Sequence, residues 1–176
     1  MDEHDPARKA VVRRFRWVDG HADIWRVFDD GPTLTAVVGG LAEPWADAGV
    51  TKVCGIEARG FLLAGGVALQ LGAGIAAIRK APALFPGDKV TLDSAPDYRG
   101  RTWQLQMQRA SLGEGDRVLL VDDWAELGSQ AVTARSLIES CGAAFLGLSV
   151  VVDQLPDDVR ARLGCVRSIA RHEDLV

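Results

Sequence analysis

The sequence predicts an α/β protein with a central, mainly parallel sheet flanked by helices. Residues 118–121 are four consecutive aliphatic residues, which can be buried on both faces only inside a parallel sheet. Two acids, Asp122 and Asp123, follow at the carboxyl end of that strand, where open α/β sheets bind their ligands. Strand-like and helix-like patterns alternate over residues 50–79, as in a βαβ unit.

Length and composition fit one domain, residues 1–176, with a full core. Hydrophobic residues make up 48% of the chain and charged residues 25%, which is ordinary for a soluble globular protein. The net charge of −4 gives no general attraction for nucleic acid, so we expect no nucleic-acid partner. The start lacks the apolar core of a signal peptide, and no apolar run is long enough to cross a bilayer. We therefore expect a cytoplasmic protein with no membrane contact.

The three cysteines, Cys54, Cys141 and Cys165, are far apart and odd in number. Their spacing fits neither a disulfide framework nor a zinc site. We expect buried free thiols, as in a reducing cytoplasm.

Residues 1–28 are expected to form an N-terminal cap. Residues 1–10 are polar and predicted to be frayed, and residues 11–28 are predicted to form two short strands around Asp19-Gly20, a dipeptide typical of hairpin turns. The basic residues here favour a solvated face over a substrate-attracting or dimer surface; they are Arg8, Lys9, Arg13, Arg14 and Arg16. A helix is predicted over residues 31–47, with Pro32 in its first turn.

The βαβ unit consists of a strand at 50–56, a tight loop at 57–60, a helix at 61–71 and a strand at 74–79. The loop lies at the carboxyl end of its strand, so Arg59 is expected to face the same crevice as Asp122. On its own, an arginine in such a loop is more often a surface residue.

Residues 80–101 show little periodicity and contain three prolines and two glycines, so they are predicted to be a long unstructured loop. A strand at 102–108 returns from it. After the acid pair, Ser129 is predicted to cap a helix, whose free N–H groups suit a phosphate beside the acids. The remaining elements are predicted at 144–152 (buried strand), 156–163 (helix) and 166–170 (edge strand).

Residues 118–130 resemble the phosphoribosyl pyrophosphate (PRPP) motif of type I phosphoribosyltransferases. Gly55-Ile56-Glu57-Ala58-Arg59-Gly60-Phe61 and Ile78-Arg79-Lys80 look like the matching segments of adenine phosphoribosyltransferases. The resemblance covers roughly residues 24–170. It implies Mg²⁺-dependent transfer of a phosphoribosyl group from PRPP to a purine-like base, with release of pyrophosphate and formation of a nucleoside monophosphate. It also implies a homodimer and a hood, residues 80–101, that closes over the site.

The resemblance assigns roles residue by residue. Asp122 and Asp123 hold the ribose hydroxyls and act on Mg²⁺ indirectly, through PRPP and water. The phosphate loop holds the 5-phosphate and comprises Ala125, Glu126, Leu127, Gly128, Ser129 and Gln130. The pyrophosphate lies against Glu57, Ala58 and Arg59, in a loop of unusual peptide geometry, with Arg79 and Lys80 beside it.

The phosphate loop departs from the family pattern. Leu127 to Gln130 stand where the family commonly has threonine, glycine, glycine and threonine, so two hydroxyl donors are missing. Each hydrogen bond to a charged group contributes about 1.5 to 3 kcal/mol. We expect Ser129, Gln130 and the backbone N–H groups to keep phosphate binding, in weakened form. The alternatives are a non-catalytic PRPP or nucleotide sensor, and hydrolysis or transfer to a non-purine acceptor.

Two acids compete to exchange a proton with the base. Transferases for 6-oxopurines carry an acid at the position of Glu126, whereas adenine enzymes use a hood pair that Asp97-Tyr98 resembles. Rigid placement at a strand-to-helix junction favours Glu126. Trp25, Arg26 and Gln154 are expected to bind the base, although core packing is the commoner role for a tryptophan alone. The polar amide of Gln154 favours a 6-oxopurine or an unusual purine over adenine.

Overall fold

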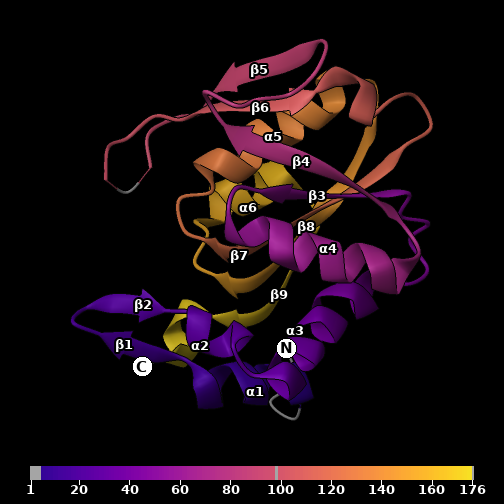
Figure 1. Ribbon diagram of the computed structural model, residues 1–176. Coiled ribbons are helices and arrows are strands. Elements are labelled where there is room, and N and C mark those ends of the chain that lie inside the picture. The colour runs from indigo at the N-terminus through magenta and orange to yellow at the C-terminus, as the bar shows by residue number, and fades with distance from the viewer. Residues whose placement is uncertain (1–4, 98, 176) are drawn as a thin grey trace.

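The computed structural model describes residues 5–97 and 99–175. Within them, a seven-stranded sheet has the order β5-β6-β4-β3-β7-β8-β9 (Figure 1). Its strands are β3 Lys52–Ile56, β4 Gly74–Lys80, β5 Lys89–Asp93, β6 Gln104–Gln108, β7 Arg117–Ala125, β8 Ala144–Asp153 and β9 Val166–Arg171. The strands from β4 to β9 in this order pair in parallel, whereas β6 and β5 join antiparallel at one edge. The predicted mainly parallel α/β sheet is confirmed.

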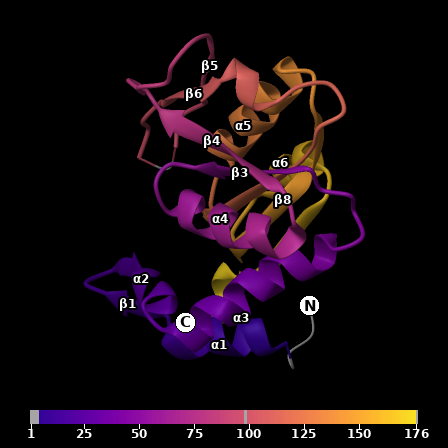
Figure 2. The same cartoon turned by 45° about the vertical axis from the view of Figure 1, so that its right-hand side comes forward.

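The central strand β7 is buried on both faces, as its aliphatic run predicts. Leu119 and Val121 face one core, formed with the helices α1 Pro6–Arg14, α3 Gly31–Ala42 and α4 Arg59–Leu71. Leu120 faces the other core, under α5 Ser129–Ser140 and α6 Asp157–Leu163. Figure 2 shows α3 and α4 on one side of the sheet and α5 on the other. No helix among the described residues is long and apolar enough to cross a bilayer.

The N-terminal region departs from the prediction. Residues 6–14 form helix α1, not a frayed end followed by a strand. Asp5 caps this helix by accepting a hydrogen bond from the Ala7 N–H at 2.9 Å, and Pro6 occupies the first turn, where its missing N–H costs nothing. Ala7 and Val11, four residues apart, bury the apolar face. The prediction for residues 1–4 lies outside the described residues.

The hairpin is confirmed, but it is shorter than predicted. Strands β1 Arg16–Val18 and β2 His21–Asp23 pair antiparallel around the turn at Asp19-Gly20. The chain then forms a short helix, α2 Trp25–Phe28, where a strand was predicted. Asp30 caps the next helix, α3, through the Thr33 N–H at 3.0 Å, and α3 ends at Ala42 in a 3-10 turn, Glu43–Trp45.

The hood contains regular structure that the sequence did not predict. Residues 89–93 form β5 and pair along their whole length with β6. Val90 is buried in the core beneath this pair. Its burial stabilises the strand, to which the proline-rich flanks contribute little. The rest of the described hood, residues 94–97 and 99–103, extends away from the sheet as an arm (Figure 1).

The cap of α5 is Gly128, not Ser129. Gly128 has a left-handed φ of 67°, and a Cβ there would lie 2.6 Å from both Leu155 Cδ2 and Val159 Cγ1. Glycine is therefore required for conformation and for space, and Ser129 becomes the first helical residue.

The cysteines are free, but their burial was predicted correctly only for Cys54. Cys141 is half-buried and Cys165 is exposed. Cys165 directly precedes the edge strand β9, where the sheet offers no cover on the outer side.

Candidate active site

A cleft of about 750 Å³ opens at the carboxyl ends of β3, β7 and β8. Most of the residues singled out by sequence meet in it: Trp25, Glu57, Ala58, Arg59, Lys80, Asp97, Asp122, Asp123, Ala125, Glu126, Leu127, Gly128, Ser129, Gln130 and Gln154. Arg26 and Arg79 do not line it. Tyr98 lies outside the described residues.

The acid pair is tied to the loop between β3 and α4. Arg59 Nε donates to Asp123 Oδ2 at 2.5 Å, and the Asp123 N–H donates to Asp122 Oδ1 at 2.9 Å. Burial raises the pKa of Asp122 well above its usual range, and the neighbouring Asp123 carboxylate raises it further. The expectation that Arg59 faces the crevice of Asp122 is confirmed.

Two glycines let this loop approach the acids. A Cβ on Gly60 would lie 3.0 Å from Asp122 Oδ1, and a Cβ on Gly55 would lie 2.4 Å from the Gly60 carbonyl oxygen. The peptide bond between Glu57 and Ala58 is cis, an unusual geometry of the kind that the family resemblance implies. The loop backbone thus lies directly against the end of β7.

Glu57 fastens the loop to the end of β4. Its carboxylate accepts from Arg79 Nη2 at 3.2 Å and from the Lys80 N–H at 3.0 Å. Burial alone would raise the pKa of Glu57, but these two hydrogen bonds and the charges of Arg79 and Lys80 together outweigh it, and the pKa is lowered. Arg79 therefore lies beside the cleft and neutralises Glu57. Lys80 lines the cleft, with its Nζ 4.5 Å from the centre of the Trp103 ring.

The phosphate loop ends at the N-terminus of α5. No side chain among the described residues caps this helix at Gly128, and the first helical bond runs from the Val132 N–H to the Gly128 carbonyl. The N–H groups of residues 129–131 therefore have no helical acceptor and carry the positive end of the helix dipole. This arrangement suits a phosphate without the missing threonine hydroxyls.

The two candidate acids differ in how they are held. The Asp97 carboxylate accepts from the Arg99 and Arg101 N–H groups at 2.9 Å and from the Trp103 indole at 3.1 Å. The Arg101 and Trp103 bonds are the main reason that the pKa of Asp97 is lowered. Burial raises the pKa of Glu126, and the Asp97 carboxylate adds to this against the opposing charges of His172 and Arg99.

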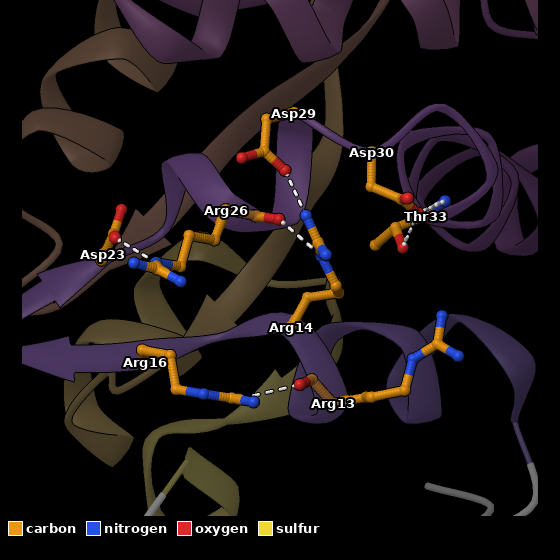
Figure 3. A network of polar contacts seen from close by, with 8 residues as sticks. All are labelled: Arg13, Arg14, Arg16, Asp23, Arg26, Asp29, Asp30 and Thr33. Atoms are coloured by element: carbon orange, nitrogen blue, oxygen red, sulfur yellow. Dashed lines mark hydrogen bonds and ion pairs between the residues drawn. The ribbon is translucent and has the colours of Figure 1, made fainter.

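A polar network positions the start of α2 (Figure 3). Arg26 Nε donates to Asp23 at 2.8 Å, and its carbonyl accepts from Arg14 Nε at 3.1 Å. Arg14 also pairs with Asp29. The Arg26 side chain therefore faces the hairpin, whereas its neighbour Trp25 is 51% exposed and lines the cleft. Of the predicted basic face, Arg14 holds α2, whereas Arg8 pairs with Asp174 and Arg16 donates to the Arg13 and Phe15 carbonyls.

The cleft-lining residues that sequence reasoning missed include three whose rings contact one another: Trp17, Trp124 and His172. The period of two along β7 could have identified Trp124, since it places this residue on the face of Asp122. Trp17 and His172 come from segments far apart in the chain and carry no local signal.

The acid pair fits Mg²⁺ held mainly by its substrate. Among residues 5–97 and 99–175, no three His, Cys, Asp or Glu side chains are grouped to hold a metal ion. Mg²⁺ commonly binds through one or two carboxylates together with substrate phosphates and water, and Asp122 and Asp123 can supply that share.

The fold and the cleft together define a type I phosphoribosyltransferase: the strand ends of a mainly parallel sheet place an acid pair between an arginine-containing loop and a helix N-terminus. Comparison with known proteins identifies the family within this class. None of the protein-family models matches the sequence. Adenine phosphoribosyltransferase of Rhodococcus opacus (strain B4) is 38% identical over 173 residues, covering 93% of this chain and 94% of the relative. The chain therefore belongs to the adenine phosphoribosyltransferase family.

Further relatives agree. Adenine phosphoribosyltransferase of Nitrobacter hamburgensis is 38% identical over 135 residues, 77% of this chain and 73% of the relative. The Giardia lamblia APRTase complexed with 9-deazaadenine matches with a TM-score of 0.84 and 28% identity, covering 94% of this chain and 97% of the other. The Rhodothermus marinus enzyme matches with a TM-score of 0.80 and 27% identity, covering 94% and 98%.

Proposed function

We propose that the protein transfers the phosphoribosyl group of PRPP to adenine, releasing pyrophosphate and forming AMP. The observation that carries the proposal is the cleft, which gathers the acid pair, the Arg59 loop and the phosphate loop at one edge of the sheet. The relatives are named for adenine, so we adopt adenine in place of the 6-oxopurine that Gln154 favoured on sequence grounds.

PRPP would span the cleft along its charged side. The 5-phosphate binds the backbone N–H groups at the start of α5, and the ribose hydroxyls bind Asp122 and Asp123. Pyrophosphate lies against the loop of residues 57–59 and Lys80, which supply backbone donors and positive charge. Arg59 then exchanges its Asp123 partner for pyrophosphate, freeing the carboxylate for the sugar. Bound Mg²⁺ would neutralise charge on the leaving pyrophosphate.

Glu126 is our choice for the group that receives the proton. As N9 of adenine forms its bond to the anomeric carbon, the bond to pyrophosphate breaks and its electrons leave with the pyrophosphate. The N9 proton passes to the Glu126 carboxylate. Its raised pKa makes Glu126 a better acceptor than Asp97, whose oxygens are already occupied by three donors. Closure of the hood would exclude water from the cationic sugar.

The test is pyrophosphate release with PRPP, Mg²⁺ and each of adenine, hypoxanthine and guanine. We expect release with adenine, together with AMP. Asp122→Asn/Asp123→Asn should weaken PRPP binding in calorimetric titration while the protein stays folded. The matched control is Asp157→Asn/Asp158→Asn, an exposed acid pair on α6. PRPP binding without pyrophosphate release for every base would replace this proposal with a non-catalytic sensor.

A further inference from the structure

The ring of Trp124 is held in place by three other rings. Phe15, Trp17 and His172 lie with their ring centroids 5.9, 6.2 and 5.9 Å from that of Trp124. Trp17 is itself anchored, because its indole N–H donates to the Leu175 carbonyl at 2.6 Å. Residues 15–17, at the start of β1, and the segment after β9 thus form a rigid aromatic wall around Trp124, at the end of β7.

Trp124 in turn orients the side chain of Gln154. The Gln154 N–H donates to the Ala125 carbonyl at 2.8 Å, which fixes the backbone. The Trp124 indole Nε1 lies 3.1 Å from Gln154 Oε1. An indole N–H can only donate, so the amide oxygen must face Trp124 and the amide nitrogen must point elsewhere.

The amide nitrogen of Gln154 is left with two donors and no acceptor among the residues that the structure describes. Both Gln154 and Trp124 line the cleft, and Gln154 is exposed. The backbone on both sides of Gln154 is held in place, because the buried Asp153 carboxylate accepts from the Leu155 N–H at 2.9 Å and pairs with Arg160. A fixed donor therefore stands in the cleft, next to the start of the phosphate loop at Ala125.

We propose that Trp124 and Gln154 select the base, with the Gln154 amide nitrogen donating to an acceptor nitrogen of the purine ring. The inference rests on the proposed function and adds a specificity-determining residue, Gln154, and a positioning residue, Trp124. Adenine offers N1, N3 and N7 as acceptors. A base that carries N–H or C–H at the contacted position leaves the amide nitrogen unpaired and is disfavoured.

Deaza analogues test this contact one ring nitrogen at a time. The kcat/KM for adenine is compared with that for 1-, 3- and 7-deazaadenine, in the wild type and in Gln154→Leu. The penalty for an analogue is its loss of kcat/KM relative to adenine. For one analogue we expect this penalty to be about fivefold to tenfold larger in the wild type than in Gln154→Leu, which corresponds to the loss of one neutral hydrogen bond. Because each analogue is compared with itself across the two proteins, its intrinsic reactivity cancels.

Trp124→Phe keeps a ring in the aromatic wall but removes the indole donor. The amide can then rotate, so we expect the penalty for the same analogue to shrink, and Trp124→Phe/Gln154→Leu to show no further change. A purely structural role for Trp124 would lower all four rates equally and leave the penalty intact. Gln70→Leu, an exposed glutamine on α4 away from the cleft, is the matched control and should keep the wild-type penalties.

Binding of AMP and its 1-, 3- and 7-deaza counterparts, measured by calorimetry, separates the two proposals. Turnover of adenine with equal analogue penalties in the wild type and Gln154→Leu overturns the inference and leaves the proposed function standing. No turnover, with a Gln154-dependent penalty in nucleotide binding, overturns the proposed function and supports the inference. Absence of both turnover and AMP binding rejects both.

Discussion

Arg59 Nε donates to Asp123 Oδ2 at 2.5 Å, which joins the loop expected to hold pyrophosphate to the acid expected to hold the ribose. The Asp123 side chain is almost fully buried, whereas that of Arg59 is 41% exposed. The arginine is therefore the partner that can move. Arg59 neutralises a carboxylate that would otherwise face the cleft unpaired.

Replacing Arg59 should weaken PRPP binding more than it affects the fold. We expect Arg59→Gln to raise KM for PRPP by about 10- to 100-fold, since a charge-assisted hydrogen bond contributes about 1.5 to 3 kcal/mol. Initial rates at varied PRPP measure this. Arg167→Gln, an exposed arginine on β9, is the control. An unchanged KM would remove Arg59 from the pyrophosphate site.

Gly55 should tolerate no side chain. A Cβ there would lie 2.4 Å from the Gly60 carbonyl oxygen and 2.9 Å from Ala64 Cβ, so α4 would have to shift. We expect Gly55→Ala to lower the free energy of unfolding by about 1 to 3 kcal/mol, measured by urea denaturation. Gly65→Ala is the matched control: it lies within α4 with open space at its Cβ, and should stabilise by about 0.5 to 1 kcal/mol. Equal effects would show that the approach of α4 to β3 is not tight.

The acid limb of the pH–rate profile should report Glu126. A base must be ionised to accept a proton, and the ionised fraction rises as pH increases through its pKa. Because the pKa of Glu126 is raised, the limb should lie above the usual glutamate value of about 4.3. Glu126→Gln should lower kcat by about 10²- to 10⁴-fold and flatten the limb. Asp97→Asn should keep it; loss of the limb in Asp97→Asn alone would make the hood acid the base.

Asp174 should stabilise the protein in a pH-dependent way. Its carboxylate accepts from Arg8 Nη2 and from the Arg171 N–H, both at 2.8 Å, and the Arg8 bond is the main reason that its pKa is lowered. A lowered pKa contributes stability above the unfolded value of about 3.9, and this contribution is lost as pH falls through that range.

We therefore expect Asp174→Asn to lower the free energy of unfolding by about 1 to 2 kcal/mol at pH 7, with the difference shrinking towards pH 3. Denaturation at a series of pH values measures this. Glu173→Gln, in the same turn but more exposed, should change little. A difference that stays constant with pH would mean that Asp174 acts through packing and not through its charge.

The homodimer expected from the resemblance is a further prediction. Leu62 and Leu69 on α4 are 56% and 86% exposed and lie two turns apart on the same side of the helix. We expect sedimentation to show a dimer, and Leu62→Glu/Leu69→Glu to shift it to monomer. Leu84→Glu, which is equally exposed but lies in the hood, is the control. A wild-type monomer across the micromolar range would exclude the dimer.

The sequence predicted correctly the strands that are buried on both faces of the sheet. Strand β7 and its neighbours were recognisable because parallel strands read as unbroken aliphatic runs. Helix α1 was missed because its buried face consists of little more than Ala7 and Val11 in an otherwise polar segment. Strand β5 was missed because prolines and glycines flank it, and it is stabilised by tertiary contacts: its pairing with β6 and the burial of Val90.

The part of the site proposed to bind PRPP was predictable from the sequence, and much of the part proposed to bind the base was not. The acid pair, the phosphate loop and the Arg59 loop are each continuous segments at strand ends, so topology alone brings them together. The part proposed to bind the base is assembled from Trp17, Trp124, Gln154 and His172, which only tertiary packing unites. The roles of Arg26 and Arg79 stay predictions: Arg26 pairs with Asp23 outside the cleft lining, and Arg79 pairs with the lining residue Glu57 but does not line the cleft itself.

The aromatic wall around Trp124 comes largely from parts of the chain that would not carry out the reaction. The choice of base and the reaction itself can therefore evolve separately. Residues 55–130 carry the parts that would handle PRPP and also Trp124, whereas Gln154 and the rings that hold Trp124, from residues 15–17 and His172, lie outside this range. Substitutions in the outer segments can therefore accumulate without touching the sugar-phosphate machinery. A lineage with this architecture can change its nucleobase through drift at the periphery, while the catalytic centre remains under continuous selection.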